Sequence, residues 1–126
     1  MGNRESFKRP HTQLDVWQEA MELVEMVYAF SSRFPAEERF GLTAQIRRAA
    51  ISIPSNIAEG AARRSSPEYQ RFLSIARGSL SELDTQLQIA ARLRYGTVTQ
   101  AISECVDSIF AKLTALMNAI NKRGAA

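Results

Sequence analysis

Apolar residues recur along most of this 126-residue chain at the spacing of amphipathic helices, and no stretch alternates with the period of two that strands show. The pattern predicts four helices, from Leu14 to Arg33, within Phe40–Arg64, from Ser66 to about Tyr95, and from Thr97 to about Lys122. The links between them are short, so consecutive helices must turn back on each other. The sequence therefore predicts an all-α fold, an antiparallel up-down-up-down four-helix bundle.

Three prolines punctuate this pattern. Pro35 ends the first helix, because proline lacks the N–H that would continue it. Ser66 followed by Pro67 is a start signal for the third helix. Pro54 lies inside the second helix, where it cannot donate to the carbonyl of Ala50, and it is predicted to kink that helix.

The third and fourth helices are separated by a second set of end signals. Gly96 is predicted to stop the third helix, since glycine is the common residue just past a helix end. Thr97, with Gln100 three residues later, resembles a capping box that opens the fourth helix.

The two chain ends lack helical periodicity. We expect a mobile N-terminal tail over residues 1–12, a bundle domain over residues 13–122 and a short C-terminal tail over residues 123–126. No apolar run approaches the roughly 20 residues of a membrane span, and the charged N-terminus lacks the apolar segment of a secretory signal. These features favour a cytoplasmic protein without membrane contact.

The first predicted helix is apolar over an arc of roughly 200°, about twice the width that packing on one side requires. Such an excess of apolar surface favours a second protein surface, and a homo-oligomer is the simplest way to supply it. The residues that make up this arc are Leu14, Val16, Trp17, Ala20, Met21, Leu23, Val24, Val27, Tyr28 and Phe30.

A narrow row of polar residues runs along the second predicted helix, within an arc of roughly 80°. Small or apolar residues border this row on both sides, unlike an ordinary solvated face. In the third helix, three polar residues share the arc of the core positions. Together these residues predict a buried polar network, made of Gln45, Arg48, Ser52, Asn56 and Glu59 in the second helix and Ser79, Glu82 and Gln86 in the third.

This network has a structural and a catalytic interpretation. A buried charge needs a partner, so we expect Arg48 and Glu82 to form an ion pair and the network to fix the register of two helices. The alternative is a polar pocket in which Glu59 or Glu82 acts as acid or base. No histidine, activated nucleophile or suitably spaced second carboxylate accompanies these residues. The structural interpretation is therefore favoured, and the sequence predicts no catalytic residue and no enzyme.

Positive charge is concentrated in the middle of the chain. The net charge is −3 over residues 1–38, +5 over residues 39–94 and +1 over residues 95–126. A basic surface that repeats in an oligomer attracts nucleic-acid phosphates. Aromatic residues are not interleaved with these arginines, so contact with the backbone is favoured over base stacking. The candidate nucleic-acid-binding residues are Arg63, Arg64, Arg71, Arg77 and Arg92, with Arg47 and Arg94 as possible additions.

Metal and cofactor chemistry are not predicted. The single histidine, His11, lies in the expected tail, and the chain has no cluster of cysteines and histidines and no glycine-rich phosphate loop. Cys105, the single cysteine, lies among apolar residues, where a core thiol is favoured over a reactive one. Gly78 inside the third helix is predicted to be a close-packing point against a neighbouring helix, rather than a ligand site.

The second and third helices also carry a family resemblance. The stretch Ser52–Gly60, with sequence SIPSNIAEG, and a second set of positions in the third helix resemble the bacterial four-helix-bundle family also known as 23S ribosomal RNA intervening-sequence proteins. The resemblance extends from Trp17 into the last helix. The positions that carry it outside Ser52–Gly60 are Gly41, Leu42, Gln45, Arg48, Ala49, Phe72, Leu73, Ala76, Gly78, Ser79, Glu82, Leu83, Gln86 and Leu87.

The resemblance implies a small helical bundle, often a ring-like homo-pentamer, encoded in some bacteria inside ribosomal RNA genes. It implies no defined molecular role. From the arginines we expect a non-enzymatic, oligomeric accessory protein that binds RNA or DNA. The alternative is a protein-interaction ring that recruits another protein, since the chain has a remote resemblance to the accessory bundles of bacterial reverse transcriptases.

Overall fold

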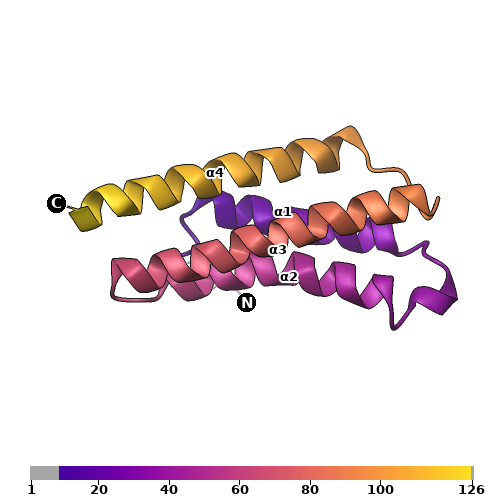
Figure 1. Ribbon diagram of the computed structural model, residues 1–126, viewed down its shortest axis with the longest axis horizontal. Coiled ribbons are helices and arrows are strands. Elements are labelled where there is room, and N and C mark those ends of the chain that lie inside the picture. Colours follow the sequence, from indigo (N-terminus) through magenta and orange to yellow (C-terminus); the bar gives the residue numbers. More distant parts are fainter. Residues whose placement is uncertain (1–8, 126) are drawn as a thin grey trace, which may run out of the picture.

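The computed structural model describes residues 9–125, which contain helices and turns but no strand (Figure 1). The elements are α1 (Asp15–Ser31), the short 3-10 helix η2 (Ala36–Glu38), α2 (Leu42–Ala61), α3 (Ser66–Arg92) and α4 (Gln100–Ala125). The predicted all-α fold with four long helices is confirmed.

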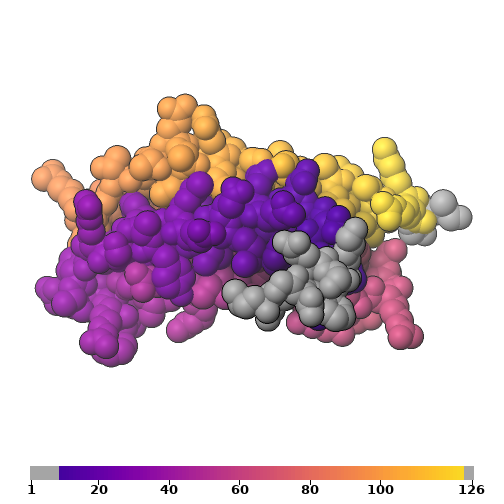
Figure 2. Space-filling view, turned by 180° about the vertical axis from the view of Figure 1, so that it is seen from behind, coloured from indigo at the N-terminus to yellow at the C-terminus, as the bar shows by residue number. Residues whose placement is uncertain are grey.

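The four helices pack in a closed arrangement. α1 contacts α2 and α4, and α3 contacts the same two helices from the other side. Successive helices run in alternating directions along the long axis, with the α2–α3 turn and the end of α4 at one end of the molecule and the other two connections at the opposite end (Figure 1). Seen from behind, α1 crosses the middle of the surface (Figure 2). Within the described residues, no helix combines the length and hydropathy needed to cross a membrane.

The structure describes part of each predicted tail. Residues 1–8 of the predicted N-terminal tail lie outside the described residues. The rest of that segment forms a turn in which the N–H of Thr12 donates to the carbonyl of Arg9 at 3.2 Å, and the ring of His11 packs 4.9 Å from that of Trp17. At the other end, α4 continues past Lys122 to Ala125.

α3 starts one residue earlier than predicted from Ser66 and Pro67, since Ser65 rather than Ser66 is the capping residue. The hydroxyl of Ser65 accepts the N–H of Glu68 at 3.3 Å, which satisfies one of the free N–H groups of the first turn, and Ser66 and Pro67 begin the helix. α2 continues through Pro54 as far as Ala61. The kink predicted at Pro54 stays a prediction.

The end of α3 differs from the prediction. The helix stops at Arg92, and Arg94, rather than Gly96, adopts the left-handed conformation with φ of 63°. The N–H groups of Arg94 and Tyr95 donate to the carbonyls of Ala91 and Ala90, as in a Schellman motif. Gly96 has another role: a Cβ there would lie 2.9 Å from the ring of Phe30 at the end of α1.

The start of α4 and the end of α1 also differ from prediction. α4 begins at Gln100, and its first turn is capped by Thr99 instead of Thr97: the Thr99 hydroxyl accepts the N–H of Ile102 at 3.2 Å. α1 ends at Ser31 rather than Arg33. The hydroxyl of Ser31 donates to the carbonyl of Val27 at 2.8 Å, so the chain leaves the helix one turn after that residue.

A carboxylate in the α1–α2 connection holds one end of the bundle together. Glu38 accepts the N–H of Leu42, the first residue of α2, at 3.0 Å, and the hydroxyl of Tyr95, just beyond α3, at 2.9 Å. These two hydrogen bonds, from Leu42 first and then from Tyr95, hold the pKa of Glu38 below its usual value.

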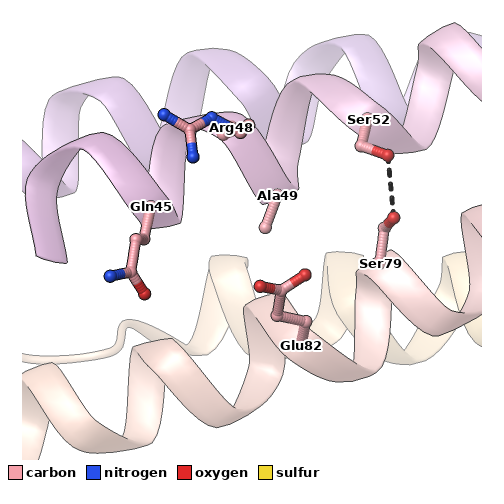
Figure 3. Close-up of a pocket in the computed structure, with 6 residues that line it drawn as sticks. All are labelled: Gln45, Arg48, Ala49, Ser52, Ser79 and Glu82. Carbon is pink, nitrogen blue, oxygen red and sulfur yellow. Dashed lines mark hydrogen bonds between the residues drawn. The ribbon is translucent and has the colours of Figure 1, made fainter.

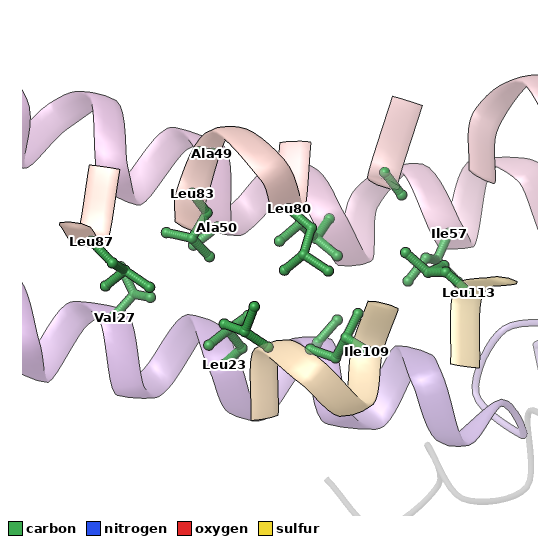
Figure 4. Packing of buried hydrophobic residues seen from close by; sticks show 14 of the residues in the cluster. Leu23, Val27, Ala49, Ala50, Ile57, Leu80, Leu83, Leu87, Ile109 and Leu113 are labelled. Carbon is green, nitrogen blue, oxygen red and sulfur yellow. The ribbon is translucent and has the colours of Figure 1, made fainter. Parts of the chain in front are cut away.

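The core is apolar and receives side chains from all four helices (Figure 4). Each fully buried Leu or Ile stabilises the fold by about 1.5–3 kcal/mol relative to an exposed one. The buried apolar residues that recur with the helical period therefore contribute most to the stability of the bundle. The largest fully buried apolar side chains are Leu23, Val27, Ile46, Ile53, Ile57, Leu73, Leu80, Leu83, Leu87, Ile109 and Leu113.

Gly60 allows α2 and α3 to approach closely where they meet the turn. A Cβ at this position would lie 3.0 Å from the Cβ of Phe72, 3.0 Å from a ring carbon of Tyr69 and 3.2 Å from the Tyr69 carbonyl. Two of those contacts involve backbone or Cβ atoms, which cannot rotate away. The two helices would have to separate to accept any larger residue.

We expect Gly60→Ala to lower the free energy of unfolding by about 1–3 kcal/mol, because the added methyl group overpacks the α2–α3 contact. Urea denaturation followed by circular dichroism measures this change. Ser55→Ala, at an exposed position of the same helix, is the matched control and should change stability by less than about 0.5 kcal/mol. Equal stabilities for the two variants would contradict the role assigned to Gly60.

Candidate functional site

A polar pocket of about 350 Å³ lies between α2 and α3 (Figure 3). It is open to solvent on one side. Its walls carry an amide, a guanidinium, two hydroxyls and a carboxylate. The lining residues are Gln45, Arg48, Ala49, Ser52, Ser79 and Glu82.

Hydrogen bonds join the two helices at one side of this pocket. The hydroxyls of Ser52 and Ser79 lie 2.8 Å apart, and the side-chain amide of Asn56 donates to the carbonyl and the hydroxyl of Ser52 at 2.8 and 2.9 Å. The structure therefore brings together three of the predicted network residues. This connection fixes how α2 and α3 are aligned.

The rest of the predicted network differs from the expectation that it is buried. Of its members only Gln86 is buried in the single chain, at 5% exposure. Ser52, Asn56 and Ser79 are partly buried, whereas Gln45, Arg48, Glu59 and Glu82 are exposed. The polar row thus lies at the edge of the α2–α3 contact, where its longer side chains reach solvent.

The predicted ion pair between Arg48 and Glu82 is not formed. The ion pairs of the described residues join Arg63 to Glu59, at 2.7 Å, and Lys112 to Glu19. In Figure 3 the carboxylate of Glu82 points into the space between the helices, while the guanidinium of Arg48 lies along α2. Because both groups are exposed, water can solvate each charge without a partner.

Gln86 makes only part of the hydrogen bonds that its side chain allows. Its side-chain N–H donates to the carboxylate of Glu82 at 3.3 Å, but its buried side-chain oxygen has no donor among the described residues. An unmet acceptor of this kind lowers stability. Gln86 does not line the pocket.

The pocket has few of the groups that catalysis requires. Its lining holds one carboxylate and no imidazole or thiol. No group of three or more His, Cys, Asp or Glu side chains that could hold a metal ion occurs within residues 9–125. The arrangement is suited to hydrogen bonding with a polar partner.

The five candidate nucleic-acid-binding arginines are all exposed, but they do not form one patch. Arg63 and Arg64 lie at the α2–α3 turn and Arg71 follows in α3. Arg92 ends α3, which at 1.5 Å per residue places it roughly 30 Å along the axis from Arg71. Arg77 lies between them and, at 100° per residue, about 120° around the helix from Arg71.

Arg63 is the most tightly held of these side chains. Its guanidinium pairs with Glu59 and lies 4.8 Å from the centre of the Phe72 ring. The ion pairs of the described residues include none of Arg64, Arg71, Arg77 or Arg92. Their charge is therefore available to a partner.

Two further cations join this end of the bundle, and the sequence analysis missed them. Gln70 in α3 donates to the carbonyl of Met117 at 2.6 Å and to the side chain of Asn121 at 3.1 Å, which places the end of α4 beside the start of α3. Burial raises the pKa of Tyr69, and the charge of Arg123 partly opposes that rise. We call the exposed cations at this end the basic end: Arg63, Arg64, Arg71, Lys122 and Arg123.

The two arginines named as possible additions have other surroundings. Arg47 donates to the hydroxyl of Ser31 at 2.8 Å and lies 4.4 Å from the centre of the Tyr28 ring, so it joins α2 to α1. Arg94 occupies the left-handed position after α3, at the end opposite the basic end.

Cys105 packs against the core as a partly buried thiol. Its sulfur lies 3.7 Å from the carbonyl of Glu19, whose carboxylate pairs with Lys112. Burial first, and then the negative charges of Glu19 and Glu22, raise the pKa of Cys105 to about 11. The thiol is thus protonated at neutral pH, as a structural role requires.

Substitutions of Gln86 and Asn56 should change the stability of the protein differently, because the buried oxygen of Gln86 has no donor whereas the side chain of Asn56 makes two hydrogen bonds. We expect Gln86→Leu to leave stability unchanged or raise it by up to about 1 kcal/mol, because it removes a buried acceptor without a donor. Asn56→Leu removes two hydrogen bonds and should lower stability by about 1 kcal/mol or more. Urea denaturation of both variants measures the difference, and a larger loss for Gln86→Leu would contradict this assignment.

Cys105 should react slowly with iodoacetamide. With a pKa of about 11, roughly one thiol in a thousand is ionised at pH 8, against about one in four for an unperturbed cysteine. Alkylation, measured by mass spectrometry, should therefore be about 200-fold slower for the folded protein than for the protein in urea. Comparable rates in the two states would show that the thiol is not protected.

The family model described as 23S rRNA-intervening sequence protein matches residues 12–121, which include all of α1, α2 and α3 and most of α4. No curated protein matches the chain.

Proposed function

Because the chain belongs to the 23S rRNA-intervening sequence protein family, we propose that it is a non-enzymatic, oligomeric accessory protein of the bacterial cytoplasm that binds RNA or DNA through its arginine-rich surface. The basic end is the observation that carries this proposal. There the fold gathers cations from two stretches that are far apart in the sequence, the α2–α3 turn with the start of α3 and the end of α4.

The charge of the basic end is mostly unopposed. Glu59 neutralises Arg63, and the other four cations take part in none of the ion pairs of the described residues. Arg63 is nevertheless held in place by Glu59 and by the Phe72 ring. A cation with a fixed position loses less side-chain entropy when it meets a phosphate.

The mode of binding follows from the chemistry of these side chains. Arginine guanidinium groups suit phosphate oxygens geometrically, and Phe72 already lies beneath Arg63 rather than being open to a base. Binding is therefore electrostatic and only weakly selective for sequence. The family name makes structured RNA the first nucleic acid to examine.

An oligomer would strengthen such binding by repeating the basic end around a symmetry axis. The family resemblance favours five subunits. Met21 and Tyr28, part of the wide apolar arc of α1, are 42% and 40% exposed in the single chain. A second copy that covers them would remove this apolar surface from water.

A protein-interaction ring is the second candidate function. The apolar side chains of Ile75 and Ile89 on α3, and of Leu93 just beyond its end, are between 42% and 51% exposed, and such positions favour a protein partner over a phosphate backbone. In that case the ring recruits another protein, such as a reverse-transcriptase-like enzyme, and the arginines serve solubility.

The double variant Arg63→Glu/Arg64→Glu should bind every nucleic acid more weakly while it keeps the fold and the assembly. Each lost phosphate contact reduces the slope of log affinity against log salt by about 0.7 for single strands and 0.9 for duplex DNA. Fluorescence anisotropy across a salt series, with structured RNA, single strands and duplex DNA, measures both quantities. Lys122→Glu/Arg123→Glu should behave in the same way.

The matched control is Arg33→Glu/Arg39→Glu, which makes the same charge change at exposed positions of the opposite end. It should weaken binding less than the variants of the basic end. Equal loss for all three double variants would show that net charge alone matters. If the wild type fails to bind at low salt, the nucleic-acid proposal fails and the protein-interaction candidate leads.

A further inference from the structure

The outer side of α3 carries a second stripe of coiled-coil spacing, directed away from the core. Its five positions alternate by three and four residues, and all five are exposed. Two of them are isoleucines that are each 42% exposed. We call this stripe the α3 seam: Ile75, Gly78, Glu82, Thr85 and Ile89.

Gly78, near the middle of the α3 seam, has no packing role within the chain. A Cβ there would meet no heavy atom within 4 Å, and its φ lies outside the left-handed region that favours glycine. Glycine in a helix interior also costs stability relative to alanine. The predicted close-packing point therefore faces outward. What glycine offers at such a position is room for a second backbone to approach.

α1 carries a matching stripe on the opposite face of the molecule. Its four positions have the same alternation of three and four and are all exposed. α1 crosses the middle of the rear surface in Figure 2, whereas α3 lies at the front in Figure 1. We call this stripe the α1 ridge: Gln18, Met21, Glu25 and Tyr28.

A pair of opposite charges links the two surfaces. The α1 ridge offers Glu25, and the pocket that Glu82 lines also holds Arg48, so a copy that packs its α1 ridge on the α3 seam brings Glu25 to a cation. Glu25 and Arg48 are both exposed, and neither takes part in an ion pair of the described residues.

We infer that the α1 ridge of one copy packs against the α3 seam of a second copy, with Gly78 at the closest approach of the two helices and Glu25 paired with Arg48. The inference rests on the oligomer of the proposed function and assigns its contact surfaces. Because the two surfaces differ and lie on opposite faces, the contact is head-to-tail, and repeating it gives a closed ring or an open filament.

Gly78→Trp tests the closest approach. The free chain has room for the side chain, so the helical circular dichroism spectrum should stay unchanged, while the assembly should dissociate in size-exclusion chromatography with light scattering. Gln88→Trp, at an exposed position on another side of α3, is the matched control and should keep the wild-type mass. If Gly78→Trp keeps the wild-type mass, the α3 seam is not the interface.

The charge pair is tested by exchange. Glu25→Arg and Arg48→Glu should each weaken assembly by about tenfold or more, because each places like charges together. The double variant Glu25→Arg/Arg48→Glu should assemble again, since every contact then joins opposite charges in a ring of any size. Failure of this double variant to assemble would overturn the pairing of Glu25 with Arg48.

The outcomes separate this inference from the proposed function. An oligomeric wild type whose mass none of these substitutions changes would overturn the interface alone. A monomeric wild type would overturn the interface together with the oligomer. Intact assembly without binding to RNA or DNA at low salt would overturn nucleic-acid binding and leave the interface supported.

Discussion

The close approach of α2 to α3 is the constraint on which the rest of the structure depends. Gly60 removes the side chain that would hold the helices apart at the turn, and small residues such as Ala49 and Ala76 are buried farther along. At this separation the hydroxyls of Ser52 and Ser79 can bond directly. The same packing determines the width of the polar pocket and the position of the turn that carries the basic end.

Much of the fold could be predicted because burial follows the helical period. The apolar stripes identified all four helices, and their centres became the core. The helix ends were harder, because several residues compete for each capping position. Thr99 caps α4 although Thr97 had the better sequence pattern, and Arg94 takes the left-handed conformation, whereas Gly96 lies against Phe30. Only the tertiary contacts decide between such candidates.

The site could be predicted less well, because angular position on a helix does not say whether a long side chain reaches water. Arg48 and Glu82 lie near the α2–α3 contact, yet both are exposed and unpaired with each other. The predicted up-down-up-down order already puts the end of α4 at the same end as the α2–α3 turn, so Lys122 and Arg123 could have been included among the candidate cations from the sequence. Gly78 was predicted to be a close-packing point against a neighbouring helix, but the space it leaves faces outward.

Glu38 makes the end opposite the basic end sensitive to acid. One carboxylate accepts hydrogen bonds from Leu42 and Tyr95 and has a lowered pKa, so its contribution to stability is complete above the usual glutamate pKa and is lost as pH falls through the lowered value. Protonation weakens both hydrogen bonds together, and the start of α2 and the end of α3 should then loosen as a unit. A protection factor at Leu42, which corrects amide exchange for its intrinsic dependence on pH, that stays constant on acidification would argue against this coupling.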